Sequence, residues 1–160
     1  MGCGGSPLPG RVSTELSYVQ TERGLQMESR EAIEQILRNS KTIAVVGLSN
    51  RPESDSHRVA AYLKDQGYDV IPVNPTVDEV LGEQSYPTIQ AIPESPDVVD
   101  VFRAPEHAPE IVEDAIAAGA KTLWMQLGIV HKEAAERARE AGLQVVMDHC
   151  MMREHRKLYA

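Results

Sequence analysis

The sequence predicts an α/β protein with a doubly wound, five-stranded parallel sheet. Short runs of branched apolar residues alternate along the chain with longer segments that carry apolar residues at helical spacing. The connections between these segments are short and rich in glycine, proline and asparagine. Strands that alternate with helices form parallel sheets with right-handed crossovers. We therefore expect a Rossmann-like fold whose strands, numbered along the chain, lie in the order 3-2-1-4-5.

The expected strands are five apolar runs. The first, IAVV at residues 43–46, is branched enough to be buried on both faces, and Gly47 ends it. Pro72 interrupts the second run, and because proline removes one ladder donor, this strand should lie at a sheet edge or contain a bulge. We expect the five strands at residues 43–46, 68–73, 97–102, 120–126 and 143–148.

Helical spacing occupies most of the segments around these strands. Ser29 is the expected N-cap of the first helix, and Pro105 lies near the start of the third, where its missing N–H costs nothing. Residues 76–96 are less regular, and we expect a single helical turn around residues 88–92. The helices are expected at residues 29–37, 57–63, 105–118, 131–141 and 150–159.

Residues 1–27 are expected to form a flexible extension before a domain over residues 28–160. They are rich in glycine, proline, serine and threonine and show no periodicity. The opening MGCGGS matches the N-myristoylation pattern at Gly2, and Cys3 offers a second lipidation site. A chance match in a tail is the alternative, with Met27 as the start of the folded part, and we expect no membrane anchor.

Length and composition are those of a cytoplasmic globular domain. The chain has 160 residues, of which 42% are hydrophobic and 25% charged, as in ordinary globular proteins. The net charge of −8 argues against general binding to nucleic acids or anionic membranes, because both need concentrated lysine and arginine. No apolar run approaches the roughly 20 residues of a membrane-spanning helix. The two cysteines are far apart and form no disulfide framework, which favours a reducing compartment.

Polar residues follow each expected strand at its carboxyl end. In doubly wound sheets a ligand lies beyond these ends, near the point where the strand order reverses. The strand, glycine, polar loop and helix at residues 41–63 are typical of a nucleotide-binding corner, where a helix N-terminus and backbone N–H groups hold a phosphate. The loops that meet at this edge are residues 47–51, 74–76, 102–105, 126–128 and 148–150.

The details of this corner disfavour NAD. The first loop has one glycine where dinucleotide enzymes carry G-x-G-x-x-G, and Asn74 follows the second strand where an acidic residue usually binds the ribose. Arg51 and Arg103 are the natural phosphate partners, because guanidinium groups match phosphate oxygens. The alternative is that both are solvated loop residues. Further hydroxyl and amide donors are available at Ser49, Asn50 and Ser56.

Five segments, in this order, resemble a known family. They are KTIAVVGLS, YDVIPVNP, VDVFRAP, LWMQLGI and VMDHCMMREHRKL. Over roughly residues 29–158 the chain resembles the small stand-alone CoA-binding proteins (the YccU-like family), which are similar to the CoA-binding domain of the succinyl-CoA synthetase α subunit. The resemblance implies a Rossmann-like fold that binds coenzyme A, or an acyl-CoA, along the carboxyl edge of the sheet.

The resemblance also implies which residues contact the cofactor. The first loop would cradle the pyrophosphate, the end of the second strand would line the adenosine side, and the third and fourth strand ends would flank the cofactor. Relatives often carry a basic residue where this chain has Thr76, so one phosphate contact is missing from the expected set. The synthetase's second domain has no counterpart here, so its ligase chemistry is not expected. The implied cofactor-binding residues are Gly47, Ser49, Asn50, Arg51, Ser56, Val73, Asn74, Pro75, Phe102, Arg103, Gln126 and Gly128.

Cys150 is the candidate nucleophile, with His149 adjacent and His155 close in sequence. Neighbours in sequence do not make a catalytic dyad, and a free cysteine is commonly a small buried hydrophobe, so we expect no catalysis. Its place at the ligand edge suggests contact with the CoA thiol, and a reversible mixed disulfide is a separate hypothesis. A metal site built from these residues and Asp148 lacks a recognised ligand spacing, and none is expected.

The predicted function is a non-catalytic CoA-binding carrier, sensor or regulatory module in the cytoplasm. A protein partner or a homo-oligomer is compatible with this function. One alternative is an acyl-CoA-dependent enzyme or a redox-active protein that uses Cys150. Another is an NAD(H)-responsive regulatory module. Ligand binding separates these hypotheses, because only the last requires NAD.

Overall fold

Five parallel strands form the central sheet of the structure, a computed structural model that describes residues 29–159. They are β2 (Thr42–Val46), β3 (Asp69–Val73), β6 (Val98–Val101), β7 (Thr122–Met125) and β8 (Gln144–Val146). The α/β class and the five-stranded parallel sheet predicted from the sequence are confirmed. The extension and the lipidation motif expected over residues 1–27 lie outside the described residues.

The strand order differs from the predicted one. The strands lie in the order β3-β2-β6-β7-β8, which is 2-1-3-4-5 along the chain, where the sequence analysis expected 3-2-1-4-5. The third strand, β6, pairs with β2 and not with β3. The outer edge of β3 is occupied instead by the connecting segment, because the Tyr86 N–H donates to Pro72 O at 3.0 Å and the Asn74 N–H donates to Tyr86 O at 2.9 Å. Pro72 thus lies in an edge strand, as its missing donor required.

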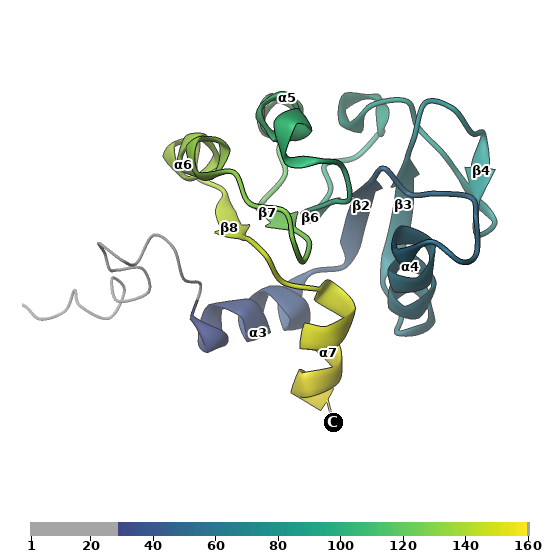
Figure 1. The fold of residues 1–160 in the computed structure, drawn as a ribbon, viewed down its shortest axis with the longest axis horizontal. Helices are drawn as coiled ribbons and strands as arrows, with labels where there is room; N and C mark the ends of the chain where they lie inside the picture. Colours follow the sequence, from purple (N-terminus) through teal and green to yellow (C-terminus); the bar gives the residue numbers. More distant parts are fainter. Residues whose placement is uncertain (1–28, 160) are drawn as a thin grey trace, which may run out of the picture.

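Helices cover both faces of this sheet (Figure 1). One face carries three helices, whose apolar side chains pack with the fully buried Trp124. They are α3 (Arg30–Asn39), α4 (Asp55–Asp65) and α7 (Met151–Tyr159). The other face carries α5, α6 and the short helix η2, which enclose a second apolar core. Their bounds are α5 (Ala108–Ala118), α6 (Lys132–Glu140) and η2 (Ile89–Ala91), and η3 (Pro105–His107) leads into α5.

Side-chain caps determine where the first two helices begin. Ser29 Oγ accepts a hydrogen bond from the Ala32 N–H at 3.0 Å, so the predicted N-cap of α3 is confirmed. Ser54 Oγ accepts from the His57 N–H at 3.3 Å, and α4 therefore begins at Asp55, two residues before the predicted start. The helix N-terminus consequently lies closer to the end of β2 than the sequence suggested.

A small hairpin between β3 and η2 was not predicted. It consists of β4 (Glu79–Val80) and β5 (Glu83–Gln84), which pair antiparallel. Lys64 Nζ donates to Leu81 O at 2.6 Å and lies 3.1 Å from Glu83 Oε2, so the end of α4 holds the hairpin in place. None of the helices in the described part of the chain has the length and apolar character needed to cross a membrane.

Candidate functional site

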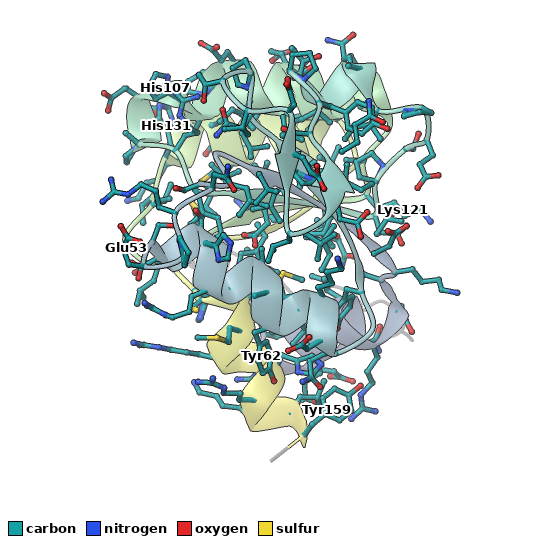
Figure 2. All side chains as sticks on the ribbon, turned by 90° about the vertical axis from the view of Figure 1, so that its right-hand side faces the viewer. Glu53, Tyr62, His107, Lys121, His131 and Tyr159 are labelled. Carbon is teal, nitrogen blue, oxygen red and sulfur yellow. The ribbon has the colours of Figure 1, made fainter. Side chains whose placement is uncertain are left out.

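The loops after β2 and β6 lie side by side at the carboxyl edge of the sheet. The chain runs from β2 outward to β3 and then returns to β6, so the strand order reverses between β2 and β6. The Phe102 N–H donates to Val46 O at 2.9 Å and holds the two loops together. Figure 2 shows Glu53, His107 and His131, which follow β2, β6 and β7, on one side of the molecule, with Lys121, which precedes β7, on the opposite side.

Gly47 and Arg103 are in contact at this reversal point. Gly47 has a φ of +87°, in the left-handed region that favours glycine. A Cβ atom at this position would lie 2.9 Å from Arg103 Cδ and 3.2 Å from Phe102 O. The aliphatic stem of Arg103 therefore packs over Gly47. Arg103 is exposed, and its Nη2 lies 3.3 Å from His107 Nε2.

The loop after Gly47 is held in shape by its own hydroxyl groups. The Ser49 N–H donates to Ser56 Oγ at 2.9 Å, and the Arg51 N–H donates to Ser49 Oγ at 3.0 Å. Ser54 Oγ in turn donates to Arg51 O at 2.9 Å. Two backbone N–H groups of the loop are thus engaged, one by the Ser49 hydroxyl of the loop itself and one by the buried Ser56 hydroxyl at the start of α4.

Arg51 is in a different environment from Arg103. Its side chain is 76% exposed and lies 2.8 Å from Glu53 Oε2. A backbone hydrogen bond at Glu53, followed by the bond from Arg51, holds the pKa of the Glu53 carboxyl below its usual value. An exposed pair of this kind contributes little to stability. Arg51 is therefore an exposed loop residue in this structure, with its charge directed to Glu53.

Asn74 fastens the loop after β3 to the loop after β2. Its Nδ2 donates to Leu48 O at 2.9 Å, and its Oδ1 accepts from the Thr76 N–H at 2.9 Å and from Thr76 Oγ1 at 2.7 Å. The residue that stands where NAD enzymes carry an acid is thus engaged in shaping the two loops. Thr76 takes part in the same arrangement.

A cleft of about 860 Å³ opens beside Arg103. Five of the predicted residues line it, namely Gly47, Val73, Asn74, Pro75 and Arg103. The sequence analysis missed the other walls, which come from η2 and from α5 through Glu110, Ile111, Glu113 and Asp114. The cleft is consequently lined by the cation Arg103 and by the carboxylates of α5. Helical periodicity alone does not show that this side of α5 faces a cleft.

Asp114 joins the two missed walls. Its Oδ2 accepts a hydrogen bond from the Ile89 N–H at 3.1 Å, which fixes the start of η2 against α5. Its Oδ1 is buried and has no hydrogen-bond partner among the described residues. The width of the cleft therefore depends on a contact between η2 and α5, made by two residues that are 25 positions apart in the chain.

A smaller cavity, of about 190 Å³, lies beside α4 and α7 at the same edge of the sheet. Phe102 and Gln126 from the predicted set line it, together with Cys150, which is a half-buried free cysteine. Apolar groups from Val59 and Ile129 form part of the wall. The remaining predicted residues, which line neither of these two cavities, are Ser49, Asn50, Arg51, Ser56 and Gly128.

The histidines near Cys150 in sequence are engaged with other groups. His149 Nδ1 lies 3.2 Å from Glu154 Oε2, and His155 Nδ1 lies 2.9 Å from Tyr62 Oη. Burial raises the pKa of the Glu154 carboxyl, but hydrogen bonds from Arg30 and His149 outweigh it and hold the pKa below its usual value. Within residues 29–159 there is no group of three or more histidine, cysteine or acidic side chains that could hold a metal ion.

Comparison with known proteins identifies the family. The model of a family described as the CoA binding domain matches residues 41–156. The chain belongs to the CoA binding domain family. The match includes all five strands and the residues of both cavities, and it confirms the resemblance drawn from the five sequence segments.

Relatives within and around the CoA binding domain family include both proteins of similar length and a much longer enzyme. The chain is 42% identical over 131 residues to Uncharacterized protein YneT of Bacillus subtilis (strain 168), a match that covers 82% of this chain and 97% of that protein. It is 44% identical to a solved hypothetical protein from Pyrococcus horikoshii OT3, with a TM-score of 0.82 over 89% of this chain and 100% of the other.

The longer enzyme is the dinucleotide forming acetyl-coenzyme A synthetase 1 of Ca. Korarchaeum cryptofilum, solved in complex with phosphate and ADP. The identity is 27% and the TM-score 0.63, over 69% of this chain. This chain spans only 26% of the synthetase chain. The CoA binding domain fold therefore occurs there as one part of a larger protein.

Proposed function

We propose that this protein binds coenzyme A or an acyl-CoA at the carboxyl edge of its sheet. The observation that supports this most directly is the packing of Arg103 over Gly47 at the reversal point, because the exposed Arg103 also lines a cleft of about 860 Å³. Ligand sites in proteins commonly have volumes of about 300–1,000 Å³. The cleft thus has room for a nucleotide, with a guanidinium group available for phosphate oxygens.

The two cavities would bind chemically different parts of such a ligand. The large cleft, which is lined by Arg103 and by the polar loop after β3, receives the nucleotide. The small cavity, with Phe102 and Cys150 in its wall, receives the neutral arm that ends in the thiol. Membership of the CoA binding domain family supports the same assignment.

The role we propose is that of a non-catalytic carrier, sensor or regulatory module in the cytoplasm. Cys150 faces the small cavity, but the two histidines near it in sequence have Glu154 and Tyr62 as partners, so neither is positioned as its base. A second protein chain, identical or different, is compatible with this role.

A redox function of Cys150 is the second candidate, and its position in the wall of the small cavity favours it. In this reaction the Cys150 thiolate attacks the disulfide of oxidised CoA, forms a Cys150–CoA mixed disulfide and releases one CoA thiolate. The intact mass of the protein, measured after incubation with CoA disulfide, should increase by one CoA unit in the wild type and stay unchanged in Cys150→Ser. An unmodified wild-type mass would refute this second function while leaving reversible CoA binding intact.

Thermal unfolding in the presence of different nucleotides tests the main proposal. A ligand that binds only the folded state raises the midpoint in proportion to the logarithm of its concentration above its Kd. CoA or acetyl-CoA should raise the midpoint, and NAD, NADP and ATP should raise it less. A midpoint raised by NAD and unmoved by CoA would overturn the proposal. Disappearance of the acyl-CoA during incubation would replace it with the enzyme alternative.

A further inference from the structure

Asp100 is a carboxyl group enclosed within the central sheet. It lies on β6 between Val45 of β2 and Trp124 of β7, and its exposed fraction is 0%. Its Oδ1 accepts a hydrogen bond from Gln126 Nε2 at 2.5 Å. Its Oδ2 is buried and has no partner among residues 29–159. Enclosing a carboxyl group in this way is unfavourable, and the other three residues of β6 are valines.

Gln126 connects this buried group to the small cavity. It follows β7 directly, is only 4% exposed, and lines the cavity that also contains Cys150. Because its Nε2 is bound to Asp100, its carbonyl oxygen Oε1 is directed away from that carboxyl group. No described residue donates to this oxygen. Among the described residues, the only buried side-chain atoms without a hydrogen-bond partner are Asp100 Oδ2 and Asp114 Oδ1, so Gln126 Oε1, which also lacks a partner, is not fully buried. The Gln126 Oε1 atom is therefore an accessible acceptor.

An acceptor on a buried side chain in the wall of a small cavity discriminates between ligands, whereas the charged residues that also line this cavity, Asp55, Arg58 and Arg153, are exposed to water. A ligand group that donates an N–H satisfies the oxygen, whereas a purely apolar group leaves it desolvated and unpaired. The volume of about 190 Å³ is below that of common nucleotide sites and suits a segment of an alkyl chain with one amide. The arm of coenzyme A between the diphosphate and the thiol carries secondary amides of this kind.

We propose that Asp100 is a positioning residue, which through Gln126 turns a carbonyl oxygen toward the small cavity to accept a hydrogen bond from an amide N–H of the ligand's arm. This inference rests on the proposed binding of CoA and assigns the small cavity to the amide-containing part of the ligand. It also gives a reason for a buried carboxyl group in the middle of a valine-rich strand.

Calorimetric titration with two ligands tests the inference. Coenzyme A carries the arm, and adenosine 3′,5′-bisphosphate is its nucleotide without the arm and without the second 5′-phosphate. Asp100→Leu removes the acceptor for the Gln126 amide, and Gln126→Met removes that amide in a chain of similar length. Both should lower the affinity for coenzyme A by about three- to tenfold and leave the affinity for the bisphosphate unchanged. Asp100→Asn should retain CoA affinity, because its Oδ1 can accept the same hydrogen bond.

The possible results separate this inference from the proposed function. Wild-type protein that binds CoA, with variants that bind it equally well, would overturn the positioning role and leave CoA binding standing. Equal losses for both ligands would also overturn it, since they would show a general distortion of the strand ends. Wild-type protein that binds neither ligand would overturn both. Circular dichroism spectra identify any variant that does not fold, and the other substitution then supplies the test.

Discussion

The two cavities at the strand ends differ in what forms their walls. The large cleft is bounded by loops, by η2 and by one side of α5, and it combines the exposed Arg103 with carboxylates such as Glu113. The small cavity is bounded by the starts of α4 and α7 and is backed by the buried pair of Asp100 and Gln126. Charged residues line both cavities, since Asp55, Arg58 and Arg153 also lie in the wall of the small one, so what distinguishes the small cavity is the buried amide of Gln126.

The largest expected effect is on stability and concerns Gly47, which lines the large cleft. Gly47→Ala adds a Cβ 2.9 Å from Arg103 Cδ at a φ of +87°, so the free energy of unfolding should fall by about 2–4 kcal/mol. Gly128→Ala is the matched control, because Gly128 has a φ of +88° and nothing within 4 Å of the added Cβ. Its loss should be only about 1–2 kcal/mol. Urea denaturation measures both, and equal losses would show that the contact with Arg103 is unimportant.

The next effect concerns the cation of the large cleft. Arg103→Ala should weaken CoA binding by about 1.5–3 kcal/mol, because a hydrogen bond between charged groups is lost. Arg51→Ala should change CoA binding much less, since Arg51 is exposed and paired with Glu53. Calorimetric titration of both variants with CoA makes the comparison. A larger loss of CoA affinity in Arg51→Ala than in Arg103→Ala would indicate that the phosphate binds at the loop after β2 and not in the cleft.

The buried carboxyl behind the small cavity should make stability depend on pH. Burial raises the pKa of Asp100 to about 7, and the hydrogen bond from Gln126 opposes this only in part. Between pH 4 and pH 7 the folded protein keeps a proton that the unfolded chain has lost, so the free energy of unfolding falls as the pH rises. Relative to Asp100→Asn, the wild type should lose about 1–3 kcal/mol over this range.

Urea denaturation at a series of pH values measures this difference. Subtracting the variant cancels other titrating groups, including His155, whose pKa burial lowers. A difference that stays constant between pH 4 and pH 7 would show that Asp100 ionises in the fold as it does in water. In Gln126→Met the free energy of unfolding should also fall as the pH rises, as in the wild type, because the carboxyl group of Asp100 remains buried.

The smallest effect concerns the acidic wall of the large cleft. The pKa of the Glu113 carboxyl is lowered by the hydrogen bond from Arg137, whose Nε lies 2.7 Å away. Glu113→Gln removes a negative charge beside the cleft and should raise CoA affinity by at most about threefold, an effect that fades at high salt. Glu133→Gln on α6, which does not line the cleft, is the control. A similar gain in the control would indicate net charge as the cause.

The strands and helix starts could be predicted because their signals are local. Apolar runs mark the strands, and Ser29 lies directly before the helix that it caps. Strand order is not local, since it depends on where residues 76–96 run. The sequence nevertheless contained the missing signal in Pro72: a proline that requires an edge contradicts the order 3-2-1-4-5, which places the second strand between two others. The order 2-1-3-4-5 places it at the edge.

The same error in strand order limited the prediction of the site. With β6 next to β2, Arg103 packs over Gly47, and α5 becomes a wall of the cleft. In the expected order 3-2-1-4-5, the first and third strands, which carry Gly47 and Arg103 at their ends, would lie on opposite sides of the second strand. Asp100 was missed for another reason: within VDVF it continues a strand pattern, and only its partner Gln126, which follows β7, indicates a role.

The three hydrogen bonds made by the Asn74 side chain bear on the kinetics of binding. One of them joins the loops after β2 and β3 and the other two shape the loop after β3, so this part of the large cleft is already assembled in the free protein. A nucleotide then needs no slow rearrangement of these loops in order to enter. Because the protein has a net charge of −8 and the proposed ligand is an anion, we expect the association rate to increase as added salt screens their repulsion.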